Sequence, residues 1–146
     1  MRRLTKISLF GIRLGLIVLA CYWMAIFAGT HWPEPPDIAP DVSDKVKHFG
    51  AYFGLGLLLC YVGKSQRPFR RFGSVAAIGI AYGAFDEITQ QFVQGRFPDV
   101  MDFLADIAGI TTAIVAFLVA KKISSRKTLD RNDSEKSAIE NQVNYP

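Results

Sequence analysis

The chain has 146 residues, of which 50% are hydrophobic and 21% charged, and its formal net charge is +4. The basic residues flank the hydrophobic segments instead of gathering on one amphipathic element, as they do in membrane proteins, so we expect no nucleic-acid partner. The two cysteines, Cys21 and Cys60, lie inside apolar segments and have the spacing of neither a disulfide framework nor a metal motif.

Four apolar segments dominate the sequence, and each is close to the ~20 residues that a helix needs to cross ~30 Å of hydrocarbon. They predict an all-α integral membrane bundle with helices over about residues 7–29, 48–63, 72–93 and 100–120. A cleaved signal peptide would also combine a basic start with an apolar run, but the first run is long for that role. From residue 121 onward the chain is polar and has no apolar face, which predicts a disordered tail over 121–146.

The loops between the segments predict the orientation of the helices. Residues 31–47 contain four prolines, which resist helix formation, and 94–98 form a tight turn with Gly95 and Pro98. These two connections hold only Lys45, Lys47 and Arg96, whereas the other fourteen of the seventeen basic residues lie in the N-terminal part, the 64–71 loop and the tail. Because Lys and Arg concentrate on the cytoplasmic side, we expect both termini in the cytoplasm of a multi-pass cell-membrane protein.

Ionisable residues in three of the predicted helices share one depth. Counted from the basic residue at the cytoplasmic end of each helix, His48, Glu87 and Asp106 lie fifteen or sixteen residues along, which is about 22–24 Å of helix. This level is the outer third of the bilayer. Just above it we expect the further polar residues Asp44, Lys45, Arg96, Asp99 and Asp102.

The spacing of small residues predicts that these polar groups face the inside of the bundle. Gly79 and Gly83 precede Glu87 at intervals of four, and Asp106 is followed by Gly109 and Ala113 at helical spacing. Small residues let helices approach closely in lipid. A charge at membrane depth costs ~3 kcal/mol, so it persists where it pairs, faces water or has a function. The acids outnumber the bases here, and Arg96 is the expected counter-charge.

Two motifs within residues 44–109 resemble those of the VanZ-like family. The first is Asp44-Lys45-x-x-His48-x-x-x-Tyr52, and the second is Glu87-x-x-Gln90-x-x-x-x-Gly95-Arg96-x-x-x-x-x-Asp102-x-x-x-Asp106-x-x-Gly109. Asp106 stands where we expect Asn in the family. The resemblance implies that residues 1–120 form a small polytopic membrane domain. The namesake of the family is associated with low-level resistance to teicoplanin-type glycopeptides.

From the depth argument and the motifs we predict a ligand-binding site in the outer leaflet that comprises Asp44, Lys45, His48, Glu87, Gln90, Arg96, Asp102 and Asp106. The expected partners are membrane lipids and a cell-envelope ligand, either a lipid-linked precursor or a glycopeptide, and the sequence leaves a homo-oligomer open. No HExxH motif, serine elbow or reactive cysteine occurs, so we predict no catalytic residue, metal or cofactor.

Three other interpretations stay open. The charged residues could form a structural ion-pair network that fixes helix register. His48, Glu87, Asp102 and Asp106 could instead serve an intramembrane metal-dependent or acid–base enzyme that acts on a lipid-linked substrate. Protonatable acids inside a bundle would also suit a small ion-coupled transporter subunit.

Overall fold

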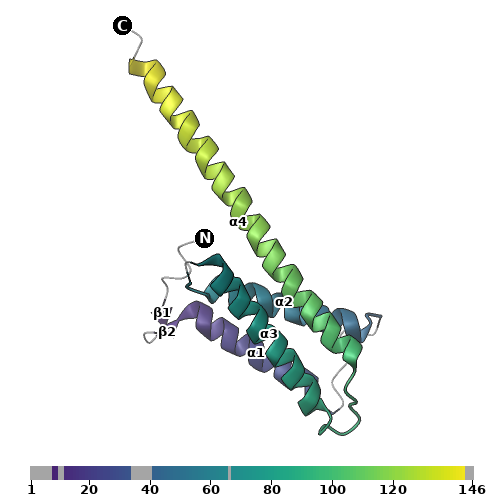
Figure 1. Ribbon diagram of the computed structural model, residues 1–146. Coiled ribbons are helices and arrows are strands. Elements are labelled where there is room, and N and C mark those ends of the chain that lie inside the picture. The colour runs from purple at the N-terminus through teal and green to yellow at the C-terminus, as the bar shows by residue number, and fades with distance from the viewer. Residues whose placement is uncertain (1–7, 10–11, 34–40, 66, 144–146) are drawn as a thin grey trace. The chain divides into compact units, whose positions relative to one another are not determined.

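The computed structural model describes residues 8–9, 12–33, 41–65 and 67–143, and it consists mainly of four helices (Figure 1). These are α1 (Leu14–Thr30), α2 (Asp44–Val62), α3 (Pro68–Gln90) and α4 (Val100–Val143). Two short strands, β1 (Ser8–Leu9) and β2 (Ile12–Arg13), pair in antiparallel fashion before α1. The prediction of an all-α chain with four helices is therefore confirmed, apart from this strand pair.

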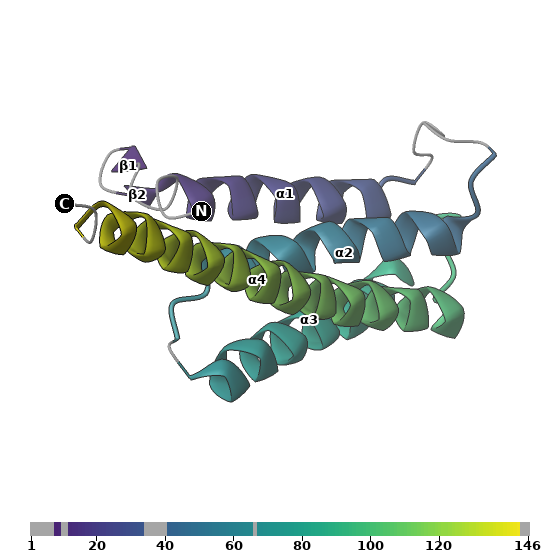
Figure 2. The same ribbon diagram turned by 90° about the horizontal axis from the view of Figure 1, so that it is seen from above.

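The chain divides into two compact units, residues 1–114 and 115–146, and α4 contributes to both. In the first unit α1, α2 and α3 pack against one another. The end of α1, the start of α2, the end of α3 and the start of α4 meet at one end of this unit (Figure 2). All of the polar residues singled out in the sequence belong to the first unit.

Several helix boundaries differ from the prediction: α3 spans Pro68–Gln90 instead of 72–93, and the starts of α1 and α2 differ for physical reasons. The first helix begins at Leu14 instead of residue 7, because Ile12 and Arg13 are extended and Arg13 donates a hydrogen bond of 2.9 Å to the Val62 carbonyl. This bond satisfies a carbonyl that the end of α2 leaves without an intrahelical donor. The second helix begins at Asp44, where a carboxylate in the first turn complements the helix dipole.

Other sequence predictions fall on parts of the chain that the structure does not describe. These are the basic residues before residue 8 and the loop positions 34–40, which include three of the four prolines. Past residue 120, where we predicted a disordered tail, α4 instead continues to Val143. Neither Gly nor Pro occurs between Gly109 and Pro146, so no residue interrupts the helix, although its side chains over 121–135 are exposed.

Small residues bring the helices of the first unit into close contact, as their spacing predicted. A Cβ atom on Gly109 of α4 would lie 2.5 Å from the Phe49 carbonyl oxygen of α2. A Cβ atom on Gly79 of α3 would lie 2.5 Å from the Ile110 side chain of α4. Real Cβ atoms do not approach neighbours so closely. At Gly109 the neighbour is backbone, so this contact requires glycine, whereas at Gly79 the Ile110 side chain would have to shift. The fully buried side chains around them include Tyr52, Leu55, Cys60 and Ile110.

The described helices differ in their capacity to cross a membrane. By length and composition one of them, α4, is long and apolar enough, over Val100–Glu140, and α1 is a shorter apolar helix of 17 residues. Helices α2 and α3 have 19 and 23 residues but include charged residues near their ends.

The close contact at Gly109 yields a stability prediction. Gly109→Ala should lower the free energy of unfolding by about 1–3 kcal/mol, because the added methyl group collides with backbone that cannot rotate away. Gly73→Ala is the matched control: Gly73 also lies inside a helix, but a Cβ atom added there would have no neighbour within 4 Å. It should raise stability by about 0.5–1 kcal/mol through helix propensity. Thermal unfolding of both variants in detergent checks this, and equal effects would contradict the packing.

Candidate functional site

A buried pair between α2 and α4 forms the centre of the polar cluster. The Nδ1 atom of His48 lies 3.0 Å from Oδ1 of Asp106, and the two residues are 6% and 1% exposed. His48 follows Asp44 by one helical turn, and Asp106 shares the small-residue face of α4 with Gly109. The close packing of α2 against α4 at Gly109 therefore also brings the two side chains together.

Glu87 of α3 joins this pair from the third helix. Its Oε2 atom accepts a 2.9 Å hydrogen bond from the backbone N–H of Asp99, and the residue is 8% exposed. One ligand atom from each of His48, Glu87 and Asp106 lies within 4.8 Å of the other two. The three residues that the depth argument placed at one level are thus in mutual proximity.

A lysine and two carboxylates form the outer rim of the cluster. The Nζ atom of Lys45 lies 2.7 Å from Oδ2 of Asp99 and 3.1 Å from Oδ1 of Asp102. The other carboxylate oxygen of Asp99 accepts the Met101 N–H at 2.8 Å and so satisfies a free amide at the start of α4. The hydrogen bond from Lys45 lowers the pKa of Asp99, which lies just before the start of α4.

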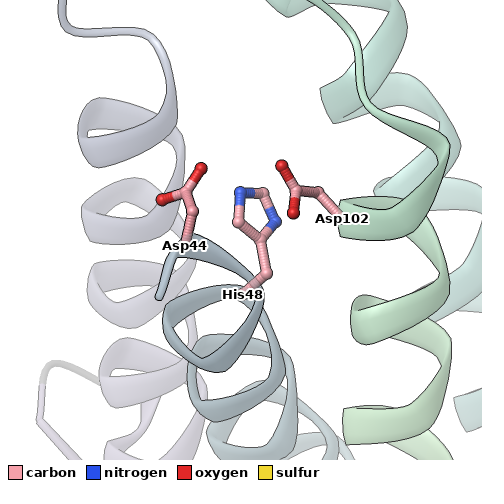
Figure 3. Close-up of side chains that lie close together, drawn as sticks. All are labelled: Asp44, His48 and Asp102. Carbon is pink, nitrogen blue, oxygen red and sulfur yellow. The ribbon is translucent and has the colours of Figure 1, made fainter. Parts of the chain in front are cut away.

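Asp44 completes the rim on the other side of the histidine. Figure 3 shows the His48 ring between the carboxylates of Asp44 and Asp102, with one ring nitrogen turned toward each side. Ligand atoms of these three residues also lie within 4.8 Å of one another. Asp44 is exposed, whereas Asp102 is 8% exposed.

A second polar group lies between α1 and α3, and sequence reasoning missed most of it. Asp86, which is 0% exposed, accepts hydrogen bonds from Thr30 at 2.9 Å and from Gln90 at 3.1 Å. His31 lies 3.7 Å from the Asp86 carboxylate, and its Nε2 atom is 2.8 Å from the Thr89 hydroxyl. The position of Gln90 one turn after Asp86 was a visible signal, but nothing in the sequence pairs Thr30 with a residue 56 positions away.

The structure brings together most of the predicted site residues but not all of them. Lys45, His48, Glu87, Asp102 and Asp106 form one cluster with Asp44 beside it, while Gln90 belongs to the Asp86 group. Arg96 instead directs its guanidinium to the Gly29 carbonyl, at 3.4 Å, and makes no ion pair within the described part of the chain. Gly95, with φ of 79°, turns the chain there, and Lys45 supplies the counter-charge that we expected from Arg96.

Several buried polar atoms in this region have no hydrogen-bond partner among the described residues. They are the hydroxyl groups of Tyr52 and Tyr82, Oε1 of Glu87 and Oδ2 of Asp106. An unpaired buried acceptor costs about 1–3 kcal/mol, so such groups usually have a partner, a water or a ligand. The cluster therefore has acceptor capacity for a further donor or cation.

The fold and the site define a small helical protein in which three helices bring carboxylates to one end of a compact unit. The comparisons with known proteins then identify its family: the VanZ/LLP1 family model matches residues 4–121, and the chain belongs to that family. This match and the long apolar helix together indicate a membrane protein. No curated protein and no solved structure matches the chain.

The rim ion pair predicts a pH-dependent contribution to stability. Because the pKa of Asp99 is lowered in the folded protein, its ion pair stabilises the fold above pH 3.8, the ordinary pKa of aspartate. This stabilisation is lost as the pH falls through the lowered pKa. The loss of stability caused by Lys45→Met should therefore be greatest above pH 3.8 and should become smaller at more acidic pH.

Melting temperatures of wild type and Lys45→Met at acidic, neutral and alkaline pH check this, with Lys64→Met as the control. Lys64 is also exposed but makes no ion pair with a described residue. Added salt should reduce the difference at neutral pH, because exposed charges are screened. A difference that stays constant across the pH range would contradict the ion pair.

Proposed function

We propose that this protein is a multi-pass membrane protein that binds a polar cell-envelope ligand at its extracytoplasmic surface. In this proposal the four helices cross the membrane with both termini in the cytoplasm. The cluster formed by Lys45, His48, Glu87, Asp102 and Asp106 is the binding site.

The distribution of charge supports the proposed orientation. The end of α2 opposite the cluster is held by arginines: Arg13 donates to the Val62 carbonyl, and Arg71 donates to the Cys60 carbonyl. The neighbouring 64–71 loop adds further basic residues and no acidic one. Under the positive-inside rule this basic end faces the cytoplasm, so the opposite end, which carries the cluster, faces outward.

The observation that carries the binding proposal is the excess of buried carboxylates over cations. Within the cluster Lys45 contacts Asp99 and Asp102, and His48 contacts Asp106. One oxygen of Glu87 and one of Asp106 then remain without a donor among the described residues. Charge-assisted donors bind such oxygens strongly.

Lys45 also indicates the chemistry of the ligand. The rim holds its primary ammonium group by two short contacts to carboxylates. The same geometry suits the ammonium group of a lipid-linked envelope precursor or of a glycopeptide. We therefore propose that a ligand of this kind binds at the rim and takes over contacts that Lys45 makes in its absence.

A second candidate function is acid–base catalysis on a lipid-linked substrate. It is favoured by the buried His48–Asp106 pair, because a carboxylate that holds one nitrogen of an imidazole orients the ring for proton transfer at the other. Turnover of a lipid-linked precursor by the purified protein, measured as released product, would favour this function over simple binding.

The binding proposal is tested with purified protein in lipid nanodiscs and two labelled probes, a lipid-linked disaccharide-peptide precursor and a teicoplanin-type glycopeptide. Saturable binding of at least one probe is expected. Asp102→Asn and Glu87→Gln should each weaken it by about tenfold or more, the equivalent of one lost charge-assisted hydrogen bond.

Asp133→Asn is the matched control, because Asp133 is an exposed acid in the unit formed by residues 115–146. It should leave the affinity unchanged. Absence of binding for both probes, or equal affinity in all variants, would contradict the proposed site.

A further inference from the structure

We propose that His48, Glu87 and Asp106 form a binding site for a divalent first-row transition-metal ion. The inference goes beyond the proposed ligand-binding function. It concerns the three inner residues of the cluster, which the proposed ligand site also includes, and its test measures metal binding without any envelope ligand, so the two proposals can fail separately.

The distances among the three donors suit a metal ion. Two ligand atoms about 2.1 Å from a metal are about 3.0 Å apart at the right angle of octahedral coordination and about 3.4 Å apart at the tetrahedral angle of zinc sites. His48 Nδ1 and Asp106 Oδ1 are 3.0 Å apart, close to the octahedral value, and a bound metal would replace the proton that these two atoms share in the hydrogen bond. Glu87 supplies a third ligand atom, and all three atoms lie within 4.8 Å of one another.

Unpartnered atoms at the same place point to a ligand. Glu87 is 8% exposed and Asp106 1%, yet Oε1 of Glu87 and Oδ2 of Asp106 have no donor among the described residues. The hydroxyl of Tyr52, one turn after His48 on α2, is likewise buried without a partner among these residues. A bound cation with its water ligands would satisfy these acceptors and neutralise the carboxylates.

The inner set suits a metal better than the outer set that shares His48. In the outer set Asp102 already binds the Lys45 ammonium at 3.1 Å, and Asp44 is exposed to solvent. In the inner set all three residues are buried, and no lysine or arginine of the described chain pairs with them. Among the residues that the structure describes, the inner donors therefore have no competing cation other than the histidine itself.

The surroundings of His48 also support metal binding through Nδ1. The ring's other nitrogen faces Asp44, on the opposite side from α4 (Figure 3). Metal-binding histidines commonly present their second nitrogen to a carboxylate, which fixes the tautomer and strengthens the donor. Asp44 would be this orienting group.

The donor set indicates the class of metal. Mg²⁺ and Ca²⁺ prefer oxygen ligands alone, whereas an imidazole with two carboxylates suits Mn²⁺, Fe²⁺ or Zn²⁺. We therefore expect the site to select Mn²⁺ and Zn²⁺ over Mg²⁺.

The experiment uses full-length protein in detergent, purified without a histidine tag, stripped with a chelator and dialysed against Mn²⁺ or Zn²⁺. Elemental analysis should find about one metal per chain, which excess Mg²⁺ does not displace. His48→Gln and Glu87→Gln should each lower metal affinity by about tenfold or more. His31→Gln is the control, because His31, the other histidine, contacts Asp86 in the separate polar group.

A spectroscopic readout keeps the test independent of how well the variants fold. Wild type with ¹⁵N-labelled histidine and bound Mn²⁺ should show nitrogen coupling in pulsed electron paramagnetic resonance, from one histidine. Absence of stoichiometric metal in the wild type would overturn the proposal. So would metal binding without nitrogen coupling, or equal affinity in His48→Gln and His31→Gln.

Discussion

Buried carboxylates impose the main constraint on this structure. Asp86, Glu87, Asp102 and Asp106 are each at most 8% exposed, and a carboxylate removed from water needs partners to compensate for its lost hydration. The partners come from other helices: Thr30 of α1 for Asp86, Lys45 and His48 of α2 for Asp102 and Asp106. These partners are within reach of the carboxylates only when the helices are in register.

Helix packing and the polar cluster depend on each other. Gly109 allows α4 to approach the Phe49 carbonyl of α2, and Gly79 accommodates Ile110 of α4. These contacts lie within about two helical turns of His48, Glu87 and Asp106, so a change in the glycines would also separate the polar groups. Asp99 also links these helices. Its carboxylate accepts a hydrogen bond from Lys45 of α2, its N–H donates to Glu87 of α3, and its side chain caps the start of α4.

The sequence allowed much of this arrangement to be predicted, because helical periodicity and rise are local properties. Counting residues along three helices placed His48, Glu87 and Asp106 at one level, and the small-residue spacing assigned their inward faces. The counter-charge could not be predicted in this way. Both Arg96 and Lys45 were candidates from the sequence. In the structure Lys45, in the first turn of α2, contacts Asp99 and Asp102, whereas Arg96, next to the left-handed turn at Gly95, contacts the Gly29 carbonyl.

The sequence also did not allow us to predict the long-range partners of the buried acids or the helical structure past residue 120. The contact of Thr30 with Asp86 depends on the tertiary placement of α1 against α3. Composition predicted a disordered tail, but the uninterrupted run of residues without Gly or Pro extends α4 to Val143. Composition indicates whether a segment can bury an apolar face, and it does not exclude an exposed helix.

A double-mutant cycle on His48 and Asp106 tests the central claim, that ionisable groups from separate helices meet inside the unit. Unfolding free energies would be measured for His48→Gln, Asp106→Asn and the double variant. Direct contact predicts a coupling energy of about 1–3 kcal/mol. The cycle of His48→Gln with Asp133→Asn should be additive. Additivity for His48 and Asp106 as well, within about 0.5 kcal/mol, would contradict the account.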